Sequence, residues 1–128
     1  MARLVLDAHL SAVSTARHWV SREVAHCTAT CPGAVDEDLV ELLTSEAVAN
    51  AVRHGAGPVS VEVHCAGQDV HVAVTDASPA TPVVRHVGVE ATGGRGVALI
   101  DQLATRWGCE LADPPAVGRT VWFQLAGS

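Results

Sequence analysis

Valines alternate with polar residues over two neighbouring segments, and this pattern constrains the fold more than any other feature of the chain. The valines recur at every second position in residues 59–63 and again in residues 70–74. A period of two predicts strands that bury one face and expose the other. Gly67-Gln68 stands between the two segments and predicts the turn of an antiparallel hairpin. The chain therefore contains a sheet that needs a covering layer on one face.

Helical spacing of apolar residues on both sides of the hairpin predicts that covering layer. Three helices are expected, at residues 10–25, 36–54 and 97–107. Further short strands are expected at residues 3–8, 109–113 and 120–125. This order of elements predicts an α+β fold, a two-layer sandwich with helices on one face of a mixed, mostly antiparallel sheet. We expect a single domain over residues 1–128.

Charge and hydropathy exclude several kinds of partner. The chain has 8 basic residues, all of them arginine, against 14 acidic ones, and its net charge is −6. Nucleic-acid binding needs clustered cations, and these arginines are too scattered to form such a patch. The absence of lysine also removes the phosphate-binding lysine of a P-loop and that of ordinary protein kinases. No apolar run approaches the roughly 20 residues that cross a bilayer, and the N-terminus does not resemble a secretion signal. We therefore expect a cytoplasmic protein without membrane contact.

The cysteines and histidines offer two alternative metal sites, and neither is favoured. Cys27 and Cys31 are four positions apart beside His26, whereas structural zinc sites usually have a tighter pair and a second pair. The hairpin sets His64 opposite His71, but two imidazoles without a third ligand make a poor zinc site. We expect the cysteines to be reduced thiols.

Three polar features stand out from the apolar pattern. Glu46 and Asn50 lie one turn apart on one face of a helix filled with alanine, valine and leucine. Asp76 ends the second strand of the hairpin, where a side chain can point into a cleft from a rigid base. Thr92-Gly93-Gly94-Arg95-Gly96 precedes a helix, and its backbone N–H groups can approach an anion closely. Taken singly, each also fits a plain structural role: an exposed polar stripe, a turn-forming aspartate or a flexible helix entry.

Taken in order, these features resemble the ATP-binding Bergerat fold shared by DNA gyrase, the heat-shock ATPases, histidine kinases and mismatch-repair ATPases. Within that fold, the chain most resembles stand-alone bacterial regulators related to anti-sigma-factor serine/threonine kinases, many of them from actinobacteria. The likeness covers nearly the whole chain and is strongest in three blocks, Ser45–Gly55, Thr75–Pro79 and Gly94–Ile100. It implies that ATP and Mg²⁺ are bound and that a lid loop extends over about residues 77–95.

The resemblance also implies a role for each matched residue. Glu46 matches the carboxylate that activates the attacking group, and Asn50 matches the magnesium ligand. Asp76 matches the acid that accepts a hydrogen bond from the adenine amino group, and Thr120 matches the threonine beside that acid. The helix entry is expected to hold the phosphates with Gly94, Arg95 and Gly96.

The implied function is that of an ATP-dependent serine/threonine kinase that phosphorylates a small antagonist protein and binds a sigma factor in its other state. The alternative is a binding module that takes up ATP and a partner protein but transfers nothing. Retention of Glu46 and Asn50 favours the kinase. The wider superfamily has Asp-x-Gly-x-Gly where this chain has Asp76-Ala77-Ser78-Pro79-Ala80, which affects the lid more than adenine binding. By resemblance, homodimerisation is expected through the outer sheet face.

Overall fold

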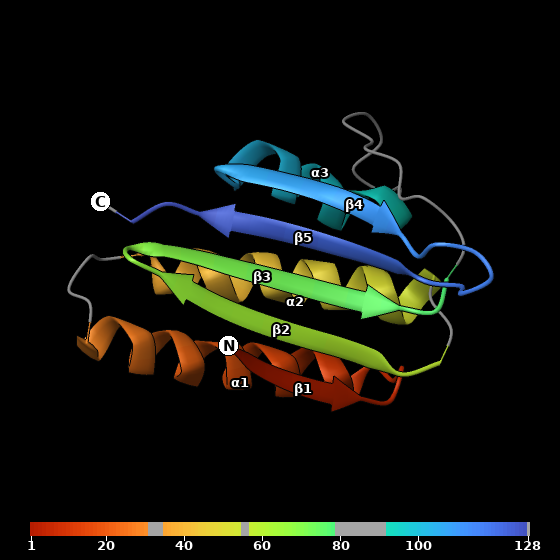
Figure 1. The fold of residues 1–128 in the computed structure, drawn as a ribbon, viewed down its shortest axis with the longest axis horizontal. Coiled ribbons are helices and arrows are strands. Elements are labelled where there is room, and N and C mark those ends of the chain that lie inside the picture. Colours follow the sequence, from red (N-terminus) through yellow and green to blue (C-terminus); the bar gives the residue numbers. More distant parts are fainter. Residues whose placement is uncertain (31–34, 55–56, 79–91, 128) are drawn as a thin grey trace.

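The computed structural model describes residues 1–30, 35–54, 57–78 and 92–127 (Figure 1). Its strands are β1 (Ala2–Leu6), β2 (Val59–Ala66), β3 (Asp69–Asp76), β4 (Arg106–Leu111) and β5 (Arg119–Leu125). Its helices are α1 (Ser11–Thr30), α2 (Glu37–His54) and α3 (Thr92–Leu103). The observed order of strands and helices is the predicted one, and the predicted α+β class is confirmed.

The sheet has the strand order β1-β2-β3-β5-β4, and each of these neighbouring pairs is antiparallel. The expected mixture of parallel and antiparallel pairs is therefore not observed among the described strands. The reason is that two elements connect β1 to β2 and two connect β3 to β5, and each element crosses the length of the sheet once. Between β1 and β2, α1 runs back along the sheet and α2 runs forward again (Figure 1). Between β3 and β5, α3 runs back and β4 runs forward. Two such crossings bring the chain back to the end of the sheet that it left, so the next strand runs in the opposite direction.

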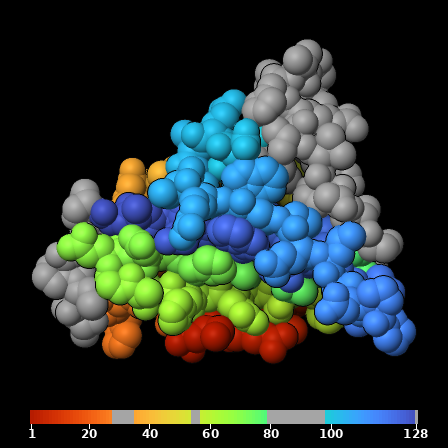
Figure 2. Space-filling model, turned by 45° about the horizontal axis from the view of Figure 1, so that its top comes forward, coloured from red at the N-terminus to blue at the C-terminus, as the bar shows by residue number. Residues whose placement is uncertain are grey.

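The described helices lie on one face of the sheet, behind the strands in Figure 1. In β3 and β5, buried and half-buried residues alternate, because successive side chains of a strand point to opposite faces. Figure 2 shows the strands as consecutive bands from β1 in red to β4 in light blue. The core between the layers consists mainly of small aliphatic side chains, and its largest fully buried members are Phe123, Leu43, Ile100, Val20, Val24, Val40 and Val48.

The hairpin of β2 and β3 has the predicted register, with His64 paired to His71 and Cys65 to Val70. Two helices differ in extent from the prediction. α1 continues to Thr30, because no proline or glycine interrupts it before Pro32. α3 begins at Thr92 and ends at Leu103, so Trp107 lies in β4 instead of on the helix.

A disulfide joins Cys27 of α1 to Cys65 of β2, so the expectation of reduced thiols is wrong for this pair. The reason is tertiary: α1 packs against β2, and the Cα atoms of the two cysteines lie 6.4 Å apart, within the range that a disulfide spans. Cys109 is a free, half-buried cysteine. Cys31 lies outside the described residues.

The lid predicted at about residues 77–95 lies largely outside the described residues, which omit 79–91. Among the helices that the structure describes, none has the length and apolar character needed to cross a membrane.

Candidate functional site

Asp76 occupies the last inward-facing position of β3. Val70, Val72 and Val74 precede it at every second position and are buried against the helices. The same alternation turns the Asp76 side chain to that face, where the residue is only 4% exposed. A carboxylate at this depth needs hydrogen-bond and charge partners, because burying an unpaired charge is costly.

Both carboxylate oxygens of Asp76 have such a partner. The Ser78 backbone N–H donates to Oδ1 at 2.7 Å, which forms a tight turn directly after the strand. The Arg119 Nε–H donates to Oδ2 at 3.0 Å. The side chains of Asp76 and Arg119 are each 2% exposed. The carboxylate is therefore held in one orientation by donors on two different segments.

Two glycines allow the chain to approach Asp76 and its neighbour closely. A Cβ built on Gly118 would lie 2.9 Å from the backbone oxygen of Asp76, and the φ of Gly118 is +152°. A Cβ built on Gly57 would lie 3.3 Å from the Ala77 Cβ, and the φ of Gly57 is +72°. Glycine is the residue that tolerates such backbone angles and close approach. Side-chain atoms at these positions would push the neighbouring segments away from Asp76.

Glu46 and Asn50 lie on α2, which packs against both β3 and α3. Asn50 is buried, with 3% exposure, whereas Glu46 is half-buried. Because α2 is helical over Glu37–His54, the predicted one-turn spacing of the two residues on a single face is confirmed. The C-terminal end of α2, the C-terminal end of β3 and the N-terminal end of α3 lie at the same end of the molecule, on the right in Figure 1.

The predicted phosphate-binding residues, Gly94, Arg95 and Gly96, fall in the first turns of α3. The sequence predicts them as a loop leading into the helix, whereas the structure includes them in it. The first N–H groups of a helix have no partner within the helix and carry its positive dipole. The backbone at this end of α3 is thus chemically suited to an anion.

Thr120 lines the same cavity as Asp76 but is not its partner in the sheet. It pairs with Thr75 in the sheet, and the two hydroxyl oxygens lie 2.8 Å apart. Thr75 and Thr120 point to the outer face, away from the helices, because each is one position from an inward-facing residue. Arg119 is the residue of β5 that pairs with Asp76 on the inner side.

Sequence reasoning missed Arg119, although a signal for it exists. Val121, Phe123 and Leu125 alternate along β5 and are buried. Extending this alternation two residues towards the N-terminus places Arg119 on the same buried face. The resemblance to the ATP-binding fold drew attention to Thr120 instead.

A cavity of about 280 Å³ adjoins the pair at the edge of the sheet. Its lining includes Asp76, Glu110, Gly118, Arg119 and the predicted site residue Thr120. The nearby Cys109 thiol has a raised pKa, chiefly because it is partly buried; the charge of Arg119 acts against this shift, whereas those of Asp76 and Glu110 act with it. This thiol is therefore a poor nucleophile at neutral pH.

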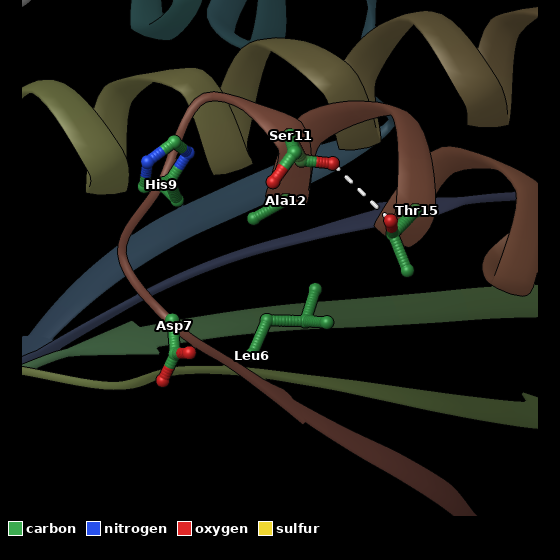
Figure 3. Close-up of a pocket in the computed structure, with 6 residues that line it drawn as sticks. All are labelled: Leu6, Asp7, His9, Ser11, Ala12 and Thr15. Carbon is green, nitrogen blue, oxygen red and sulfur yellow. Dashed lines mark hydrogen bonds between the residues drawn. The ribbon is translucent and has the colours of Figure 1, made fainter.

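A second hollow, of about 370 Å³, lies between the end of β1 and the start of α1 (Figure 3). Leu6, Asp7, His9 and Thr15 are among its lining residues, and the Thr15 hydroxyl donates to the carbonyl oxygen of Ser11 at 3.2 Å. No residue predicted for the functional site lines it.

The alternative metal sites gain no further ligands within the described residues. No group of three histidine, cysteine, aspartate or glutamate side chains there could hold a metal ion. His71 stacks on Trp122 with ring centroids 5.2 Å apart. Cys27 is bonded to Cys65. The described residues around His64 and His71 therefore provide no third ligand for a zinc ion.

Comparisons with known proteins identify the family of this chain. No curated protein matches the sequence, whereas 27 chains of solved structures match the fold. One of them is the histidine kinase AdeS of Acinetobacter baumannii, which is 13% identical, with a TM-score of 0.49 over 98% of this chain and 68% of that chain. Residues 6–125 match the family described as the histidine kinase-like ATPase domain. Since that match spans nearly the whole chain, the protein belongs to the histidine kinase-like ATPase domain family.

Proposed function

We propose that this domain binds ATP with Mg²⁺ and is a cytoplasmic serine/threonine kinase of the anti-sigma-factor type. Its substrate would be a small antagonist protein, and its second partner a sigma factor. The observation that carries the proposal is that a carboxylate at the end of β3, Asp76, and a carboxamide on α2, Asn50, are both buried. Burial of a polar side chain is costly unless it forms hydrogen bonds or binds an ion.

The polar groups at this end of the molecule suit ATP and Mg²⁺ as ligands. The carboxylate of Asp76 accepts hydrogen bonds, so it complements the exocyclic amino group of adenine. The amide oxygen of Asn50 is a hard ligand of the kind that Mg²⁺ prefers. The N-terminal backbone of α3, at Gly94 and Gly96, complements phosphate. Bound ATP would supply the transferable phosphoryl group.

Glu46 is the residue that we propose to take a proton from the substrate hydroxyl. It is half-buried on α2, one turn before Asn50, so it can reach the solvent side of the site where a protein substrate would arrive. Arg95 belongs to the first turns of α3, and we propose that it is the cation beside the phosphates. The charge of −6 supports protein partners over nucleic acid, and a homodimer through the outer sheet face is part of the same proposal.

Substitution of the two α2 residues tests the kinase. Glu46→Ala should leave ATP binding intact and slow phosphoryl transfer by about 10²–10⁴-fold, the usual worth of a positioned base. Asn50→Ala should weaken ATP binding only when Mg²⁺ is present and should abolish transfer. Glu41→Ala is the matched control, since Glu41 is also half-buried on α2 and has no proposed role.

The readout is transfer of labelled phosphate to a candidate antagonist protein, with slow ATP hydrolysis as the second readout. Wild-type protein that binds Mg-ATP but shows neither transfer nor hydrolysis would mean that the domain is a binding module. Unchanged transfer in Glu46→Ala would remove this residue from the mechanism.

Nucleotide choice tests Asp76 independently. GTP presents an oxygen where ATP presents an amino group, and that oxygen would face the carboxylate. Loss of a charge-assisted hydrogen bond should favour ATP by about tenfold to a hundredfold. A competition titration measures the ratio, and equal affinities would exclude Asp76 as the adenine-reading residue.

A further inference from the structure

Arg119 shares the inner face of the sheet with Asp76 and faces it directly. The two residues pair across β3 and β5, and they are among the buried charged residues that the structure describes. The residue after Arg119, Thr120, lies on the opposite face, where it contacts Thr75. Among the described residues of β5, Arg119 is therefore the one whose side chain bonds to the Asp76 carboxylate.

The contact between the two residues fixes the plane of the carboxylate. The Arg119 Nε–H holds Oδ2 at 3.0 Å, and the Ser78 N–H holds Oδ1 at 2.7 Å. An ionised carboxylate has about four acceptor positions on its two oxygens, so these two bonds leave capacity for a ligand donor. With each oxygen anchored to a different segment, the carboxylate cannot rotate without breaking one of the bonds.

We propose that Arg119 is a positioning residue that makes Asp76 selective for a purine with an amino group at position 6. This inference rests on the proposed ATP binding and goes beyond it, because it assigns base selectivity to a residue outside the predicted site. Arg119 acts through the orientation and charge of Asp76, not by contacting the reacting phosphate.

Selectivity follows from rigidity. A fixed, charged carboxylate accepts a hydrogen bond from a 6-amino group and repels a 6-oxo group, so it discriminates both by attraction and by repulsion. Without the guanidinium, the carboxylate can turn away from a 6-oxo group. This freedom weakens discrimination between the two bases more than it weakens phosphate binding.

The test compares the affinities for ATP and inosine triphosphate, which differ at position 6, in the presence of Mg²⁺. Wild-type protein should prefer ATP by about tenfold or more. Arg119→Met keeps much of the side-chain length but removes the charge, and it should reduce the ratio to within about threefold. Arg119→Lys keeps a buried cation without the guanidinium fork, so its ratio should fall between those of the other two proteins.

Arg106→Met is the control, because Arg106 is exposed on β4 and its contact is with Gln124; its ratio should equal that of wild type. A folded Arg119→Met protein with the wild-type ratio would overturn the proposal. If Arg119→Met does not fold, a wild-type ratio in Arg119→Lys would overturn it equally. Failure of wild-type protein to bind either nucleotide would instead refute the proposed function, so the two failures are distinguishable.

Discussion

At the scale of single residues, backbone conformation and side-chain burial together shape the end of β3. Gly118 brings β5 against the backbone of Asp76, and Arg119, the next residue, then reaches the carboxylate. A buried ion pair of this kind contributes little net stability relative to an apolar pair, but removal of one partner is strongly destabilising. Its presence in a small domain therefore favours a role in binding over a role in stability.

Substitution of Gly118 should affect both folding and nucleotide affinity. In Gly118→Ala, the new Cβ would meet the Asp76 backbone oxygen at 2.9 Å with φ at +152°, so β5 must shift. Such strain costs about 1–3 kcal/mol of unfolding free energy, and we expect ATP affinity to fall as well. Gly67→Ala is the matched control, since Gly67 also has a positive φ, +61°, but nothing within 4 Å. It should cost about 1 kcal/mol and leave ATP affinity unchanged. Denaturant titration and nucleotide titration provide the two measurements, and equal affinities of the two variants would contradict this account.

At the scale of elements, the two layers are joined covalently as well as by packing. The disulfide between α1 and β2 closes a segment with a sequence separation of 38 residues. Cys65 lies near the hairpin turn, whereas Asp76 lies at the other end of β3, so the disulfide and the candidate site occupy opposite ends of the sheet.

Reduction of this disulfide should lower stability without altering ATP binding. A cross-link over a segment of this length typically stabilises a domain by about 2–4 kcal/mol, mainly by restricting the unfolded chain. Addition of reductant should therefore lower the Tm of wild-type protein. It should leave the Tm of a Cys27→Ser/Cys65→Ser variant unchanged, and ATP affinity should be the same throughout. A reductant effect of equal size in the double variant would assign it to another thiol.

The pH dependence of stability should report on the outer face of the β2–β3 hairpin. Burial, followed by the neighbouring charge of His64, lowers the pKa of His71 below its ordinary value of 6.5, while Glu110 and Glu62 act in the opposite direction. The unfolded chain therefore takes up a proton at higher pH than the folded protein, and stability should fall as pH drops below about 6.5.

His71→Gln should make that fall shallower, whatever the loss of stacking on Trp122 does to stability at neutral pH. His18→Gln, at an exposed position of α1, is the control and should retain the wild-type slope. Urea denaturation at pH values between about 5 and 8, a range that includes the ordinary pKa of histidine, gives the slope of unfolding free energy against pH for each protein. An unchanged slope in His71→Gln would show that another group causes the dependence.

At the scale of the whole molecule, α2 is the central element of the helical layer. It packs against α1, α3 and both strands of the hairpin, and its buried apolar side chains belong to the hydrophobic core cluster of the described residues. Loss of one side chain from this helix should therefore destabilise the complete fold instead of one part of it.

Two adjacent leucines of α2 test this expectation. Leu43 is fully buried, whereas Leu42 is 41% exposed. Leu43→Ala should reduce the free energy of unfolding by about 2–5 kcal/mol through lost burial and the cavity left behind. Leu42→Ala should cost less than about 1 kcal/mol. The transitions seen by circular dichroism and by tryptophan fluorescence should coincide in both variants, and separate transitions would mean that the layers unfold independently.

The sequence alone determined the local structure and most of the residues now proposed for the site. The alternation of Val70, Val72 and Val74 predicted β3 and its buried face, since strand period and burial are both local properties. Helical spacing placed Glu46 and Asn50 on one face of α2 for the same reason. The resemblance in three blocks pointed to the ATPase fold, and the family match supports it.

Only the tertiary structure decided which residues meet across the chain. The Cys27–Cys65 disulfide joins residues 38 positions apart, and neither cysteine lies in a spacing pattern that indicates a partner. The antiparallel pairing of β3 with β5 likewise decided that Arg119, and not Thr120, is the partner of Asp76 in the sheet. A shift of one residue in register moves every side chain of a strand to the other face. The register is set by the burial of both strands against the same helices, which depends on the assembled core and not on any local stretch of the sequence.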